Sequence, residues 1–112
     1  APLAFDAKLS YTARQWATEQ ASRRRISHEW FQSGQLKSAH QQKFGEDPRL
    51  AAENVAMVPC SADPKATAQA FMSAWMNSSG HRANILRNGP KRLGVGIGSA
   101  DNYCFGTQDF GF

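Results

Sequence analysis

Three residues of this sequence have side chains that could do chemistry and lie in informative segments. His28 lies in RRRISHEWF, Glu53 in the apolar segment LAAENVAMV, and His81 in SSGHRANIL. Two imidazoles and one carboxylate are ligand types that zinc and similar divalent metals accept. The same groups can also act as a general acid and base. Glu53 has to be paired, protonated or placed in a pocket, because an unpaired charge inside an apolar strand is costly.

The spacing of these residues matches no known metal or nucleophile motif. The sequence has no His-Glu-x-x-His, no Cys-x-x-Cys and no Gly-x-Ser-x-Gly. The glycines of GVGIG alternate along an expected strand, which excludes a phosphate-binding loop. A lone histidine is commonly a hydrogen-bonded structural residue, and this interpretation stays open for His28 and His81. We assign it to His40, which lies in a polar stretch.

Two long helices are expected to position these residues. The first begins at Asp6, which can cap it, and ends near Arg24. Its buried face has the three-to-four spacing of an amphipathic helix and comprises Phe5, Leu9, Ala13, Trp16, Ala17 and Gln20. The second has Asp63 at its cap and Pro64 in its first turn, and Gly80 marks its end. Its expected buried face comprises Ala68, Phe71, Met72, Trp75 and Met76.

The rest of the chain predicts a loop and a small sheet. The polar stretch 33–47 is expected to be a long surface loop with at most one helical turn over 37–43. A strand follows Pro48 and ends at Pro59. In RLGVGIGSA, apolar residues alternate with glycines, so one side of this strand lets another backbone or a ligand approach closely. A turn at 101–102 completes a terminal hairpin. The whole chain, 1–112, is therefore expected to be one α+β domain.

Cys60 and Cys104 are the only cysteines. An even pair in a small basic domain predicts a disulfide and an oxidising compartment, and two buried free thiols are the alternative. A bridge enclosing nearly half the chain would contribute roughly 4 kcal/mol.

The bulk properties limit the possible partners. The net charge is +4, which weakly favours acidic cell-wall polymers or anionic membrane surfaces. The arginines at 23–25 fall where cations suit a helix's negative end, so we expect no specific nucleic-acid binding. No apolar run has the length of a membrane span. The opening APLAFDAKL has no signal-peptide pattern, so we expect any targeting segment to have been removed or never present.

Taken in order, the segments resemble the CAP superfamily, which contains cysteine-rich secretory proteins, antigen five and plant pathogenesis-related proteins of class one. The matching pieces are LAFDAKLSYTARQWA, ISHEWF, AENVAM, SAWMNSSGHRANIL, RLGVGIG and GTQDFG, which run from Leu3 to Gly111. The blocks ENVA and GHRANIL are specific. The second is most similar to the short secreted microbial members.

The resemblance implies an α-β-α sandwich, secretion, and a cleft lined by two histidines and two acidic residues. By position, His28, Glu53 and His81 correspond to three of these four. The fourth acid would fall near Ser78, so the set is incomplete. The family's first helix is absent from this sequence, which predicts an uncovered apolar face that is a liability or an interface for self-association.

Two classes of function follow as expectations. The first is a secreted binding module without turnover, which holds a small apolar or lipid ligand, or a divalent metal such as zinc through His28 and His81. The second is a metal-dependent, protease-like hydrolase with Glu53 as general base. A nuclease is a third and weaker alternative, which the histidines, Glu53 and the clustered arginines suggest. The missing nucleophile and missing fourth acid favour binding over catalysis.

Overall fold

The computed structural model describes residues 3–112, in which helices and strands alternate along the chain. The elements are β1 (Ala4–Phe5), α1 (Ala7–Arg23), α2 (Glu29–Ser33), α3 (Gln35–Phe44), β2 (Leu50–Pro59), α4 (Pro64–Met76), α5 (Ser79–Leu86), β3 (Arg92–Ala100) and β4 (Tyr103–Gly111). The strands form one mixed sheet in the order β1-β3-β4-β2, with β1 parallel to β3 and the other pairs antiparallel. The expected α+β class is confirmed.

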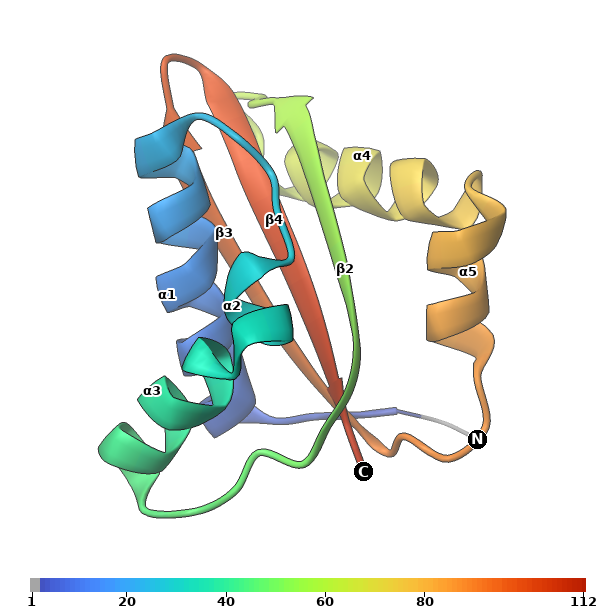
Figure 1. Cartoon of the computed structure of the whole chain (residues 1–112). Coiled ribbons are helices and arrows are strands. Elements are labelled where there is room, and N and C mark those ends of the chain that lie inside the picture. Colours follow the sequence, from blue (N-terminus) through green and yellow to red (C-terminus); the bar gives the residue numbers. More distant parts are fainter. Residues whose placement is uncertain (1–2) are drawn as a thin grey trace.

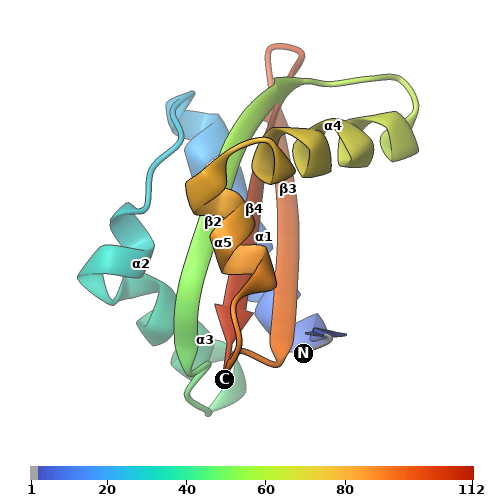
Figure 2. The ribbon, with the colours of Figure 1, turned by 90° about the vertical axis from the view of Figure 1, so that its right-hand side faces the viewer.

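The sheet is the middle layer of an α-β-α sandwich. Figure 1 shows α1, α2 and α3 on one side of the sheet and α4 and α5 on the other. In Figure 2, α4 crosses one end of the sheet, α5 lies over its middle, and the opposite end of β3 has no helix in front of it. Both candidate histidines therefore come from segments that pack on the sheet, but from opposite layers.

The glycines of β3 let α1 lie directly on the sheet, as the alternation predicted. A Cβ at Gly96 would lie 2.2 Å from the backbone nitrogen of Arg14, and one at Gly94 would lie 2.5 Å from the carbonyl carbon of Leu9. Contacts this short cannot exist, so side chains at these positions would force the helix off the sheet. The buried face of α1, which includes Trp16, fills the core on this side. Phe5, which was predicted on this face, lies before the helix in β1 and is 71% exposed.

The predicted helix starts are confirmed. Asp6 accepts a hydrogen bond from the Leu9 amide at 2.8 Å, and Asp63 accepts one from the Lys65 amide at 3.0 Å. These bonds satisfy amide groups that have no partner within the helix. The end of the second helix differs from the expectation, because α4 ends at Met76 and Gly80 lies inside α5.

The stretch 33–47 was predicted to be mostly a loop, and this is wrong. Residues Gln35–Phe44 form the ten-residue helix α3. Leu36, His40 and Phe44 recur every four residues and face α1, where Leu36 and His40 are buried. With only one aliphatic residue in this stripe, the helical period is hard to see in the sequence. The contact with α1 stabilises the helix, and local hydrophobicity contributes little.

The predicted buried face of α4 is only partly correct. Phe71 and Trp75 are buried, but Ala68 is exposed and Met72 is 41% exposed. On the sheet below, Val95 is half-buried and Ile97 is exposed. These residues border an apolar groove between α4 and β3. The groove lies on the sheet face that Figure 2 shows to be partly without a helix.

The disulfide between Cys60 and Cys104 is confirmed, and it ties the end of β2 to the start of β4. Within residues 3–112, no helix is long and apolar enough to cross a membrane.

Candidate functional site

His28 is held in place by two side chains of α1. The indole nitrogen of Trp16 donates to the Ser27 carbonyl at 3.0 Å, and the Ser27 amide donates to Gln20 Oε1 at 3.1 Å. Trp16 also stacks on Trp30 of α2, with ring centroids 4.8 Å apart. The buried face of α1 therefore fixes the backbone immediately before His28.

His28 contacts Glu53 and so gives this carboxyl group a partner inside its apolar strand. The Nδ1 atom of His28 lies 2.9 Å from Glu53 Oε1. The His28 side chain is 37% exposed, whereas that of Glu53 is fully buried on β2. A carboxylate oxygen only accepts, so Nδ1–H donates to it. The pair therefore fixes the orientation of the imidazole and leaves Nε2 as the ring nitrogen that makes no contact with Glu53.

A second buried carboxyl group, on Asp109, lies behind Glu53. Asp109 of β4 is the cross-strand partner of Glu53 and has no exposed surface. As ionised groups, Glu53 Oε2 and both Asp109 oxygens would have no hydrogen-bond donor among residues 3–112. A proton shared between the two carboxyls removes this deficit, because the protonated group donates to the other. Burial raises the pKa of Glu53 to about 7 and that of Asp109 well above its usual range.

His81 lies on α5, which is hydrogen-bonded to Asn54, the residue next to Glu53. It lies in the first turn of α5, where its ring nitrogen Nδ1 is 3.0 Å from Ser78 Oγ. Its carbonyl accepts a hydrogen bond from Asn54 Nδ2 at 3.1 Å. Asn54 Oδ1 in turn accepts one from Asn84 Nδ2 at 2.8 Å. The buried Asn54, which follows Glu53 in β2, thus fastens α5 to the sheet beside the His28–Glu53 pair.

The structure brings His28 and Glu53 into one pocket but does not include His81 in its lining. This pocket has a volume of about 250 Å³, and its wall includes Phe31, Gln32 and Asn84. Across residues 3–112, no group of three or more His, Cys, Asp or Glu side chains is arranged to hold a metal ion. The expectation that the two imidazoles face each other across a cleft stays a prediction.

Sequence reasoning missed Asp109, Asn54 and Asn84. A signal for Asp109 was available, because TQD interrupts an otherwise apolar and glycine-rich terminal strand. All three residues of that tripeptide are buried. Three consecutive polar residues inside a strand have to find partners on both faces of the sheet. Their presence indicates a polar cluster in the core.

The sequence and the fold are both similar to those of known proteins. The sequence model of CAP, the cysteine-rich secretory protein family, matches residues 1–110. The uncharacterized protein YkwD of Bacillus subtilis (strain 168) is 31% identical over 113 residues, which cover 97% of this chain and 39% of that protein. The chain thus spans about two fifths of the length of this curated relative.

Solved structures of similar fold are also known. An outer surface protein of Borrelia burgdorferi superposes with a TM-score of 0.68 at 20% identity, over 99% of this chain and 77% of that one. An extracellular protein with an SCP domain from Bacillus anthracis str. Ames superposes with a TM-score of 0.59 at 26% identity, over 96% of this chain and 33% of that one. The structure of NaASP2 with Zn²⁺ superposes with a TM-score of 0.66 at 18% identity, over 97% of this chain and 59% of that one. The first and third show the fold alone.

Proposed function

The chain belongs to CAP, the cysteine-rich secretory protein family, and we propose that it is an extracellular binding module that holds a divalent metal ion at His28. Proteins with this domain are typically extracellular, and one similar structure is that of an extracellular protein. The disulfide Cys60–Cys104 agrees with an oxidising compartment.

The observation that carries the proposal is the 2.9 Å contact between His28 Nδ1 and Glu53 Oε1. Histidines that bind metals commonly donate their other ring N–H to a carboxylate, which fixes the tautomer and makes the ligating nitrogen more basic. Glu53 is in this position behind His28, and the half-exposed His28 ring is accessible from solvent. His28 therefore has the support that a metal ligand needs.

A site built from His28 and His81 would bind a metal ion weakly. His81 Nδ1 contacts Ser78 Oγ, and where this hydroxyl accepts from Nδ1–H, Nε2 is available to a metal. Two imidazoles fill half of a tetrahedral shell, and water would supply the rest. NaASP2, a protein of the same fold, was solved with Zn²⁺. A bound ion would supply Lewis acidity, while His28, His81 and Glu53 would hold and orient it.

The position of Glu53 argues for binding over hydrolysis. A general base has to reach a water molecule, but the Glu53 side chain is fully buried. One of its oxygens contacts His28 and the other faces Asp109. As the supporting partner of His28, Glu53 needs no access to solvent.

Titration calorimetry with zinc tests this function. We expect weak binding by the wild type and at least tenfold weaker binding by His28→Ala, a loss of about 1.4 kcal/mol. The half-exposed acidic residue Glu19, which does not line the His28 pocket, gives a control, because Glu19→Ala should bind like the wild type. Identical heats for the wild type and His28→Ala would mean that His28 has no metal role.

A second candidate function rests on the apolar groove between α4 and β3. The groove has a volume of about 220 Å³, and Gln108 is its only polar lining residue among residues 3–112. Its surface suits a small apolar ligand, because binding would remove Met72 and Ile97 from water. A fluorescent fatty-acid analogue should bind the wild type and lose affinity in Met72→Glu. Met57→Glu, at an exposed methionine outside the groove, is the matched control. Equal binding by both variants would contradict this assignment.

A further inference from the structure

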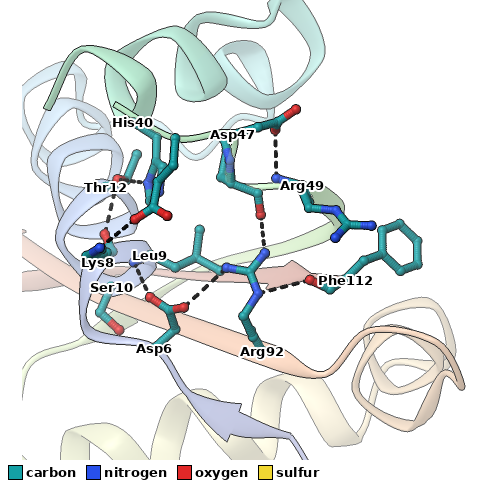
Figure 3. Close-up of polar contacts among 12 residues, drawn as sticks. Asp6, Lys8, Leu9, Ser10, Thr12, His40, Asp47, Arg49, Arg92 and Phe112 are labelled. Carbon is teal, nitrogen blue, oxygen red and sulfur yellow. Dashed lines mark hydrogen bonds and ion pairs between the residues drawn. The ribbon is translucent and has the colours of Figure 1, made fainter. Parts of the chain in front are cut away.

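A second polar pocket lies where the start of α1, the end of α3 and the C-terminus meet, and it shares no lining residue with the His28 pocket. Its volume is about 570 Å³, which is within the range of small-molecule sites. Figure 3 shows the side chains around it: His40 and Thr12 on one side, Arg49 and Phe112 on the other, and Arg92 between them.

His40 contributes a buried hydrogen-bond acceptor to this pocket. Only 2% of its surface is exposed, yet it forms part of the pocket wall. Its Nδ1 lies 2.7 Å from Thr12 Oγ1, and that hydroxyl donates to the Lys8 carbonyl at 3.2 Å. In the tautomer that lets Thr12 donate to this carbonyl, Thr12 accepts from His40 Nδ1–H and His40 Nε2 keeps its lone pair. No residue of 3–112 hydrogen-bonds to this Nε2.

Charges of both signs surround His40. Asp6 and Glu46 line the same pocket and favour a cation at His40, whereas Lys8 and Arg92, which pair with them, oppose it. A neutral acceptor nitrogen beside carboxylates suits a positively charged N–H donor such as an ammonium group. The same nitrogen disfavours an anion, because its lone pair would repel the anion and it has no proton to donate.

The two arginines of the pocket differ in what they can offer. The Arg92 guanidinium is already engaged, because it donates to Asp6 Oδ2 and to the carbonyls of Phe112 and Pro48. The Arg49 guanidinium makes no hydrogen bond or ion pair with any residue of 3–112. It is exposed at the pocket rim and can receive a carboxylate. The partly exposed ring of Phe112 adds an apolar surface.

We propose that this pocket binds a small zwitterion, a short peptide with free termini or an amino acid. The ligand's ammonium group donates to His40 Nε2, and its carboxylate pairs with Arg49. Burial lowers the pKa of His40, so the ring stays neutral and able to accept at neutral pH. Arg49 supplies the opposite charge at the other side, and an apolar side chain of the ligand contacts Phe112.

The test is calorimetric titration of the 112-residue protein with alanyl-phenylalanine, and with phenylalanine to distinguish peptide from amino acid. We expect N-acetylation of the dipeptide to weaken binding at least tenfold, because the ammonium group is lost. Amidation of the dipeptide's C-terminus should weaken binding by the wild type about fivefold. The same amidation should not change binding by Arg49→Asn, because the partner of the carboxylate is already lost. Asparagine tolerates the left-handed backbone of Arg49, whose φ is 53°.

Arg24→Asn is the matched control, because Arg24 has a φ of 54° and is exposed outside this pocket. Amidation of the dipeptide should weaken binding by Arg24→Asn as much as it weakens binding by the wild type. Nitrogen-15 NMR supplies an independent readout: the dipeptide should move the Nε2 signal of His40 and leave those of His28 and His81 unchanged. The proposal is overturned if neither zwitterion binds at millimolar concentration, if the acetylated dipeptide binds as tightly, or if the His40 signal does not move.

Discussion

Glu53 of β2 and Asp109 of β4 are cross-strand partners, and their two carboxyl groups lie together in the protein interior. Two neighbouring buried carboxylates cannot both be ionised without a large penalty, so the pair retains a proton that isolated carboxyls would have lost. His28 lies at the outer end of this arrangement and contacts Glu53. The protonation of the buried pair is therefore linked to folding and to the imidazole at the surface.

The first prediction is that stability falls as pH rises from about 4.5 to 7. Burial raises the pKa of Glu53 from 4.5 to about 7, so the folded state binds more protons than the unfolded chain in this interval. Stability from this proton is fully present below the unfolded pKa and is lost as pH passes the folded one. At 1.4 kcal/mol for each pKa unit, the loss is about 3 kcal/mol.

Urea unfolding of Asp109→Asn at pH 5 and pH 8 checks this prediction. Asparagine keeps the shape of Asp109 but has no carboxyl proton to lose, so the fall in stability should be smaller than in the wild type. Asp101→Asn, at an exposed aspartate in the hairpin turn, should retain the wild-type fall. The same pH dependence in Asp109→Asn and the wild type would contradict the shared proton.

The second prediction concerns His81. His81→Ala should abolish zinc binding and leave the fold intact, because α5 is fastened by the His81 carbonyl and by Asn84, which this change does not remove. Binding by the wild type should also weaken in acid, because protons compete with the metal ion for the imidazole nitrogens. Zinc titration at two pH values, with circular dichroism as a fold check, measures both effects. Undiminished zinc binding by a folded His81→Ala would show that His28 acts without it.

The third prediction concerns the contact between α1 and the sheet. Gly96→Ala should destabilise the protein by about 2 kcal/mol or more, because the new methyl group would lie 2.2 Å from the backbone of Arg14. Gly80→Ala is the matched control, since a Cβ there has no neighbour within 4 Å and alanine favours the helix α5. Thermal unfolding compares the two variants. Equal melting temperatures would mean that α1 can shift at no cost.

The fourth prediction concerns the disulfide. Replacing both Cys60 and Cys104 by alanine should lower the free energy of unfolding by roughly 4 kcal/mol, because the bridge restricts a long loop of the unfolded chain. Urea unfolding of the double variant measures the loss. Native wild-type protein should resist alkylation without reductant, and two thiols that react freely would show that the bridge is absent.

The sequence by itself determined the features that depend on neighbouring residues. Asp6 and Asp63 cap helices through bonds to amides two or three residues away, so their roles can be predicted from local order. The alternation of Gly94 and Gly96 with apolar residues predicted a strand with one bare side. Glu53 required a partner because of its apolar surroundings, and His28 is that partner.

Only the tertiary structure decided which distant residues meet. Asp109 faces Glu53 because of the β2–β4 register, and a shift of one residue would turn its side chain to the other face. His40 is buried because α3 packs on α1, which a weakly apolar sequence does not reveal. Met72 is exposed because α4 crosses only one end of the sheet. Capping and periodicity act over a few residues, whereas register and helix placement depend on the packing of the whole chain.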